Sequence, residues 1–251
     1  MRETVYVHLD TISNSILTKG ISAHDFYQSL SHIPDNIMLL NQEHDWGEFE
    51  NHTAMRIIKG REQVEQYLSS AQRNEENTCW IDFSDLHLIK QLTPIEISEL
   101  LYFGHMKYHL HSPFFYKLQN DYVFLTLGEE VNKLYCRQLE DFYRLLSQKI
   151  HEQLLERCKE RKGWIKKPIS ITPPPLYVLK ELKEVWQEGV VLYFGGVTWD
   201  EEQVHLPIYR VEDRLKNVDE IEYTKEMQVA ELIYHRKEEE WTTQLILGEE
   251  L

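Results

Sequence analysis

The stretch from Leu92 to Leu127 constrains the fold most, because it marks where a helix begins and where it must end. Thr93 is placed to cap the helix, and Glu96, three residues later, completes a capping box. Pro113 disfavours helical backbone at the residue before it, so the helix must end by that point. The alternating residues of Asp121 to Leu127 then predict a strand. A helix that leads directly into a strand favours an α+β fold.

Hydrophobic periodicity in the rest of the chain supports the same class. Apolar residues recur every three or four positions from Asn132 to Lys162, which predicts a long amphipathic helix. Met227 to His235 is expected to pair as a hairpin with Glu240 to Leu247, and a helix through Met227, Ala230, Ile233 and Trp241 is the alternative. Pro207 favours an edge position for the strand predicted at His205 to Val211. Further strands are predicted at Thr4 to Leu9, Asn36 to Leu40, Met55 to Lys59, Cys79 to Phe83 and Val190 to Phe194.

The sequence therefore predicts an α+β protein with a mixed sheet, amphipathic helices and a smaller, strand-rich C-terminal region. A proline-containing linker is expected at residues 163–175, because three consecutive prolines there favour an extended segment. This linker would separate an α+β region at 1–162 from a smaller α+β region at 176–251. A single compact body is the alternative.

The charge and the cysteines restrict the function classes. A formal net charge of −15 opposes nonspecific binding to nucleic acid or to an anionic membrane surface. The acidity is concentrated after Gly196, where 15 acidic residues outnumber 6 basic ones. Three widely spaced cysteines give no disulfide framework, and the N-terminus lacks the apolar core of a signal peptide. We expect a soluble, cytoplasmic protein that does not bind membranes.

A histidine cluster follows the predicted helix. His105 and His109 are one turn apart, and His111 lies just beyond, so the three imidazoles could share one divalent transition metal. Met106 and Lys107 stand where the metal-binding HExxH motif has glutamate and its neighbour, so that motif is absent. The alternatives are a metal-dependent hydrolase or oxygenase, and histidines that only satisfy surface or core groups.

Three consecutive aromatic residues follow the helix-ending proline. Phe114, Phe115 and Tyr116 are candidates for contact with a protein partner, because aromatic side chains dominate the energetics of interfaces. No nucleophile elbow, phosphate-binding loop or kinase motif accompanies them. The leading hypothesis is a non-enzymatic, cytoplasmic protein-binding or regulatory protein. The sequence leaves the partner, the oligomeric state and the presence of an enzymatic activity undecided.

A polar loop at Gln42 to His52 has two interpretations. It holds several carboxylates and histidines around Trp46 and Phe49, and it is either an acidic lid over a pocket or a surface connection pinned by its aromatic residues.

Overall fold

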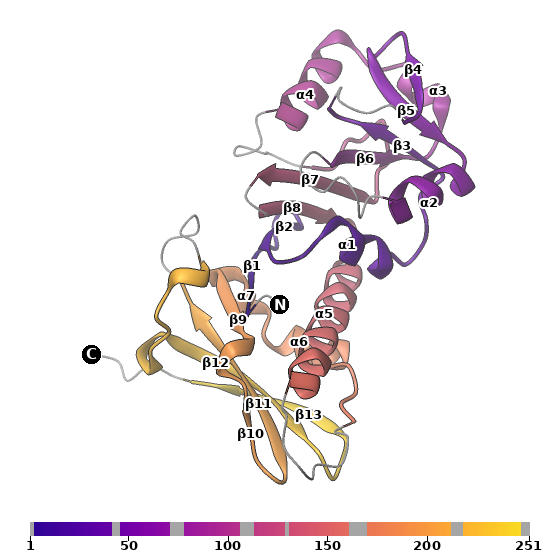
Figure 1. Cartoon of the computed structure of the whole chain (residues 1–251). Helices are drawn as coiled ribbons and strands as arrows, with labels where there is room; N and C mark the ends of the chain where they lie inside the picture. Colours follow the sequence, from indigo (N-terminus) through magenta and orange to yellow (C-terminus); the bar gives the residue numbers. More distant parts are fainter. Residues whose placement is uncertain are drawn as a thin grey trace. The chain divides into compact units, whose positions relative to one another are not determined.

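The computed structural model describes residues 3–41, 46–70, 78–105, 113–128, 131–160, 170–211 and 218–246. The chain divides into two compact units (Figure 1). Unit 1 combines Met1–Leu9 with Tyr143–Leu251, and unit 2 is the continuous stretch Asp10–Phe142. Unit 2 is therefore inserted in the sequence between the first strand of unit 1 and the remainder of that unit.

Unit 2 is an antiparallel sheet with the strand order β2-β8-β7-β6-β3-β5-β4. Its strands are β2 (Ser15–Lys19), β3 (Asn36–Leu39), β4 (Glu48–Glu50), β5 (Met55–Lys59), β6 (Cys79–Phe83), β7 (Tyr122–Gly128) and β8 (Val131–Cys136). Its helices are α1 (Ala23–Ser29), α2 (Arg61–Ser70), α3 (Leu86–Ile89) and α4 (Pro94–His105).

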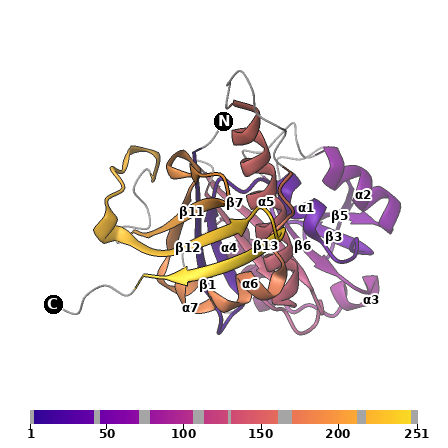
Figure 2. The same cartoon turned by 90° about the horizontal axis from the view of Figure 1, so that it is seen from below.

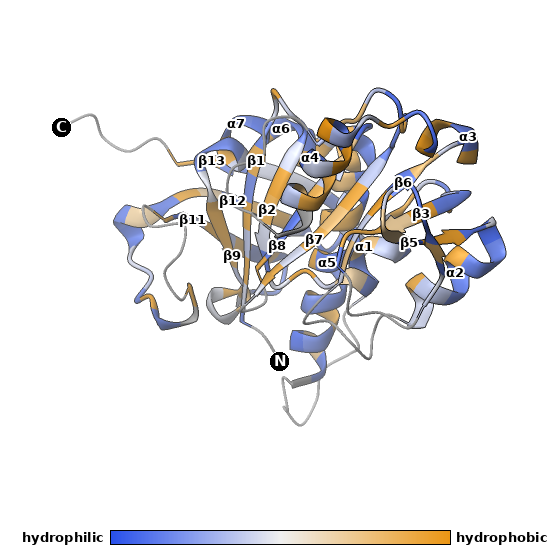
Figure 3. Ribbon diagram, turned by 90° about the horizontal axis from the view of Figure 1, so that it is seen from above, coloured by the Kyte–Doolittle hydropathy of each residue, from blue (hydrophilic) through white to orange (hydrophobic). Residues whose placement is uncertain are grey.

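Helices pack on both faces of the unit 2 sheet. Side chains alternate between the faces along each strand, so neighbouring residues of one strand contact different helices. On one face, Ile81 and Val123 belong to a buried cluster that includes Phe103 of α4. On the other face, the ring of Phe124 lies 5.6 Å from that of Phe26 in α1. Figure 3 shows the apolar residues along strands such as β7 and polar residues on helices such as α2. The residues at the ends of β6 and β7 therefore lie at the border of the two layers of buried side chains, one on each face of the sheet.

Unit 1 has the strand order β13-β12-β11-β9-β1, with β10 paired to β11. The strands are β1 (Thr4–Asp10), β9 (Val190–Tyr193), β10 (Thr198–Trp199), β11 (Gln203–Arg210), β12 (Gln228–His235) and β13 (Glu240–Leu245). The helices are α5 (Leu139–Glu160), which begins in unit 2, α6 (Leu176–Glu181) and α7 (Lys183–Glu188). Short 3-10 turns are η3 (Phe194–Gly196), η4 (Val218–Glu220) and η5 (Lys225–Met227).

Two buried tryptophans fix the helices and the connecting segment of unit 1. The indole N–H of Trp186 in α7 donates to the carbonyl oxygen of Leu179 in α6, at 2.8 Å. The indole N–H of Trp241 in β13 donates to the carbonyl oxygen of Thr172, at 2.9 Å. Both rings are buried, so each places a large apolar surface in the core while its single polar group is satisfied.

The predicted α+β class is confirmed, and so is the C-terminal hairpin, which forms as β12 and β13. Within each unit the described strand pairs are all antiparallel. The expectation of a mixed sheet is therefore wrong. The helix expected from Asn132 is shorter, because residues up to Cys136 form β8 and α5 begins at Leu139.

The edge position expected from Pro207 is wrong, since β11 lies between β9 and β12. Pro207 falls between His205, which pairs with β10, and Ile208, which pairs with β9. The missing N–H therefore coincides with a gap in the pairing on that side of β11, where it removes no ladder hydrogen bond.

The expected linker at residues 163–175 is described only from residue 170 onward. That part is held against α5, because the Ser147 hydroxyl donates to the carbonyl oxygen of Pro174 at 2.6 Å. A division of the chain at the linker stays a prediction. Among the described residues, no helix is long and apolar enough to cross a membrane.

Candidate functional site

The aromatic segment Phe114–Tyr116 lies between α4 and β7 of unit 2. Phe114 and Phe115 are half-buried against the core, and the ring of Phe115 meets that of Phe103 edge-on, with centroids 5.6 Å apart. Tyr116 is different, because 79% of its surface is exposed. The segment thus anchors itself with two phenylalanines and presents one large aromatic side chain to solvent.

The backbone under Tyr116 is held by side-chain amides. The buried Asn120 accepts a hydrogen bond from the backbone N–H of Phe115 at 2.8 Å and donates one to the carbonyl oxygen of Pro113 at 2.9 Å. The amide of Gln119 donates to the carbonyl oxygen of Tyr116 itself. These bonds hold the backbone of the turn in place.

The residue after Tyr116 ties the turn to α4. The Lys117 ammonium lies 2.7 Å from a carboxylate oxygen of Glu96 and donates to the carbonyl oxygen of Gln91 at 2.9 Å. The hydrogen bond from Lys117, followed by those from Thr93, lowers the pKa of Glu96 to about 2. The predicted capping box is present, since the Thr93 hydroxyl accepts from the backbone N–H of Glu96 at 3.3 Å.

Arg137, which follows β8, connects the aromatic segment to a group of charged residues. Its guanidinium lies over the ring of Phe114, 5.1 Å from the centroid, and its Nη1 lies 3.3 Å from a carboxylate oxygen of Asp121. The other carboxylate oxygen of Asp121 lies 3.3 Å from Nε2 of His32. We call Phe114, Tyr116, Asp121, Arg137 and His32 the Tyr116 surface.

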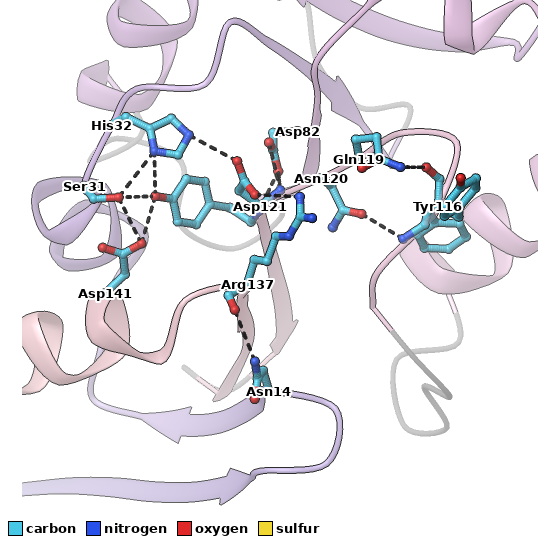
Figure 4. A network of polar contacts seen from close by, with 12 residues as sticks. Asn14, Ser31, His32, Asp82, Tyr116, Gln119, Asn120, Asp121, Arg137 and Asp141 are labelled. Carbon is cyan, nitrogen blue, oxygen red and sulfur yellow. Dashed lines mark hydrogen bonds and ion pairs between the residues drawn. The ribbon is translucent and has the colours of Figure 1, made fainter. Parts of the chain in front are cut away.

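The second ring nitrogen of His32 faces a group of hydroxyls (Figure 4). Its Nδ1 lies 3.3 Å from both the Ser31 hydroxyl and the Tyr122 hydroxyl. Both hydroxyls also contact one carboxylate oxygen of the buried Asp141, at 3.2 and 2.9 Å respectively. The two hydroxyl oxygens are 2.9 Å apart.

The carboxylates fix part of this network, because they can only accept hydrogen bonds. The Ser31 and Tyr122 hydroxyls each have the Asp141 carboxylate as an acceptor. At the other end, Nε2 of His32 faces the Asp121 carboxylate. The side chains of His32 and Asp121 are 48% and 33% exposed, so solvent reaches this end of the network.

A buried carboxylate lies under the turn into β7. Both oxygens of Asp82 accept from the backbone N–H of Asp121, at 3.0 and 3.1 Å, and one accepts from that of Tyr122 at 2.6 Å. Burial, with a smaller contribution from the nearby Asp121 carboxylate, raises the pKa of Asp82 to about 7, against the lowering effect of these backbone bonds. Asp82 thus fixes the backbone that carries Asp121.

The predicted metal ligands fall largely outside the described residues. His109 and His111 belong to residues 106–112, which the structure does not describe, and His105 is described only as the last residue of α4. Among the described residues, no group of three or more histidine, cysteine, aspartate and glutamate side chains is arranged to hold a metal ion. The metal site stays a prediction.

The loop at Gln42 to His52 is described from Trp46 onward. The ring of Trp46 packs against that of Tyr67 in α2, with centroids 5.7 Å apart, and Phe49 is exposed in β4. Nε2 of His52 lies 2.8 Å from the carbonyl oxygen of Leu92. These contacts support a surface connection that is pinned to the body of unit 2.

Sequence reasoning missed Ser31, His32, Asp121 and Asp141. They are separated by up to 110 positions, and each is a common polar residue in a turn or a first helical turn. Only the antiparallel order of the strands brings them together, so no local pattern could have identified them. No family model, curated protein or solved structure matches this chain.

Proposed function

We propose that the protein is a non-enzymatic, cytoplasmic binding protein that holds a protein partner through the Tyr116 surface. The observation that carries this proposal is the 79% exposure of Tyr116 on a turn whose backbone is fixed by neighbouring side chains. Exposed tyrosines at the centre of an interface are frequent hot spots, because they bury a large area at a small cost in conformational entropy.

Preorganisation supports the same role. Ordering a loop on binding reduces affinity, and the bonds from Asn120 and Gln119 have already ordered this one. Phe114 and Phe115 give further support, because their contacts with the core hold the segment from below. Tyr116 can therefore enter a pocket of the partner with little rearrangement of its own backbone.

The polar groups of the Tyr116 surface supply specificity. His32 and Arg137 both contact Asp121, so an imidazole and a guanidinium share one carboxylate at a part-exposed position. A partner with a further carboxylate would pair with the guanidinium of Arg137. Rim charges of this kind mainly affect the association rate and the choice of partner.

A photo-crosslinking amino acid at position 116 tests the proposal. p-Benzoylphenylalanine in place of Tyr116 should capture a partner that the same residue in place of Phe49, an exposed aromatic residue of β4, does not capture. With the captured partner purified, Tyr116→Ala should weaken the Kd about 30-fold, which corresponds to about 2 kcal/mol for a hot-spot tyrosine. Phe49→Ala is the matched control and should leave the Kd unchanged. A Kd that is equal for Tyr116→Ala and the unaltered protein would contradict the proposal.

A further inference from the structure

β13 forms an edge of the unit 1 sheet that lacks the usual protection. It is the last strand in the strand order of the described residues. Its pairing with β12 is uninterrupted, from the pair Ala230–Leu245 to the pair His235–Glu240. Natural edge strands are usually short, bulged or marked with lysine or proline, which prevents pairing with other chains. The six residues of β13, EWTTQL, show none of these features. In unit 2, by contrast, the edge strand β4 has only three residues.

The register shows which backbone groups face outward. The N–H of Ile246 donates to the carbonyl oxygen of Val229 at 2.9 Å, which continues the pairing of β12 with β13 by one residue. Hydrogen-bonded pairs alternate along an antiparallel ladder, so Gln244, Thr242 and Glu240 also bond to β12. The backbone N–H and C=O groups of Trp241, Thr243 and Leu245 therefore point away from β12, as a ready template for another strand. Figure 2 shows β13 alongside β12.

Exposed apolar side chains gather at the same edge. Of the large apolar side chains that the structure describes as exposed, two belong to unit 1, namely Tyr177 at 62% and Leu245 at 56%. Leu245 is on β13 itself. Tyr177 is in α6, one turn before Glu181, whose carboxylate accepts from the Thr243 hydroxyl at 2.9 Å. Residues four apart lie on one side of a helix, so Tyr177 shares the side of α6 that meets β13.

The charge at this edge selects the occupant. Glu240 on β13 shares a face of the sheet with Glu231 in β12, because Glu231 pairs with Gln244, four positions from Glu240. Glu181 adds a carboxylate on the opposite face, where it contacts Thr243. The segment from Gly196 to Leu251 holds 15 acidic and 6 basic residues. Pairing with a second copy would bring like charges together, whereas a cationic strand would be attracted.

We propose that the outer edge of β13 binds an extended, lysine- or arginine-containing segment of a partner protein, which adds to the sheet as a further strand. Outward backbone groups of Trp241, Thr243 and Leu245 supply the affinity, as in other complexes formed by strand addition. On the face of Glu240 and Glu231 the added strand places its basic side chains, and on the opposite face Tyr177 and Leu245 receive its apolar ones. This edge belongs to unit 1, so Tyr116→Ala in unit 2 should not alter binding to it.

Two capped peptides of equal charge separate strand pairing from simple charge attraction. A fluorescent peptide of alternating lysine and valine should bind the full chain with a Kd at least about tenfold tighter than a peptide of alternating lysine and proline, which lacks half of the backbone donors. Fluorescence anisotropy measures both. Equal binding of the two peptides, or no binding of either, would overturn the proposal.

Substitutions at Thr243 locate the site. Its N–H faces outward, so Thr243→Pro removes a donor to the peptide and leaves the bonds to β12 in place. We expect Thr243→Pro to weaken binding of the lysine–valine peptide about tenfold, and Thr243→Ala, which keeps the N–H, to change it less than about twofold. Unchanged binding by a folded Thr243→Pro variant would reject the site. If that variant does not fold, hydrogen exchange of the unaltered protein decides: the peptide should slow exchange of the Trp241, Thr243 and Leu245 amides, and unaltered exchange there would reject the proposal.

Discussion

At the scale of single residues, Asp82 couples the stability of unit 2 to pH. Burial raises the pKa of this carboxyl to about 7 in the folded protein, from an ordinary value of 3.8. Between these values the folded state binds more protons than the unfolded chain. The free energy of unfolding therefore falls as the pH rises through this range and levels off above about 7.

Replacing Asp82 by asparagine should remove this dependence. Urea unfolding at about pH 5 and about pH 8 should show a smaller loss of stability for Asp82→Asn than for the unaltered protein, because the amide does not ionise. Asp35→Asn, which neutralises an exposed carboxylate, is the control for the remaining titrating groups. Equal losses in the unaltered protein and in Asp82→Asn would show that Asp82 does not titrate in this range.

Single substitutions also test the metal site predicted at the histidine cluster. If the protein is a non-enzymatic binding protein, elemental analysis of the purified, untagged chain should find no stoichiometric zinc, iron or manganese. Stoichiometric metal that is lost in His109→Ala and kept in His87→Ala would instead establish the metal site predicted at His105, His109 and His111. It would also redirect the search toward hydrolytic or oxidative substrates.

At the scale of elements, the start of α4 depends on the reciprocal bonds between Thr93 and Glu96. The backbone N–H of Thr93 donates to the Glu96 carboxylate at 2.7 Å, and the Thr93 hydroxyl accepts in return. Thr93→Ala should lower the free energy of unfolding by about 1 kcal/mol, since it leaves a helix N–H without its acceptor. Thr93→Ser keeps the hydroxyl and should stay close to the original stability in the same urea titration. A Thr93→Ala variant as stable as Thr93→Ser would show that the cap contributes nothing.

Elements with strong local signals were predictable from sequence. The cap of α4 and the β12–β13 hairpin are specified by residues a few positions apart. By contrast, the helix was predicted to begin at Asn132, whereas residues up to Cys136 form β8, whose partners are in β2 and β7. The contacts of His32 with Asp121 and Tyr122 depend on that same strand order, so they could not be predicted before the sheet was known.

At the scale of the whole molecule, one unit is formed by a continuous stretch of sequence and the other by two separate stretches. Unit 2 is continuous from Asp10 to Phe142, whereas unit 1 needs Met1–Leu9 as well as Tyr143–Leu251. β1 pairs with β9, from the pair Thr4–Tyr193 to the pair Val7–Val190. Removing the first nine residues therefore leaves β9 without one of its partners.

We therefore expect the fragment 10–142 to fold alone and the fragment 143–251 to fail. Circular dichroism with thermal unfolding should show a cooperative transition for the first fragment and none for the second, because β9 would keep its pairing with β11 but expose the backbone groups and buried side chains that β1 covers. Addition of a peptide of residues 1–9 to the second fragment is the matched test of the cause. Cooperative folding of 143–251 without that peptide would contradict the expectation.

The insertion of unit 2 after β1 has a consequence for synthesis on the ribosome. β1 leaves the exit tunnel first, but its partner β9 begins at Val190, so translation of the entire inserted unit separates the two. Domains generally fold as they emerge, at about 5–20 residues per second, so roughly 10 to 40 seconds pass between the synthesis of β1 and that of β9, and unit 2 can fold in that time. Until β9 is made, the backbone groups of β1 that pair with it lack this partner, and a chaperone that covers short apolar segments would find its target there.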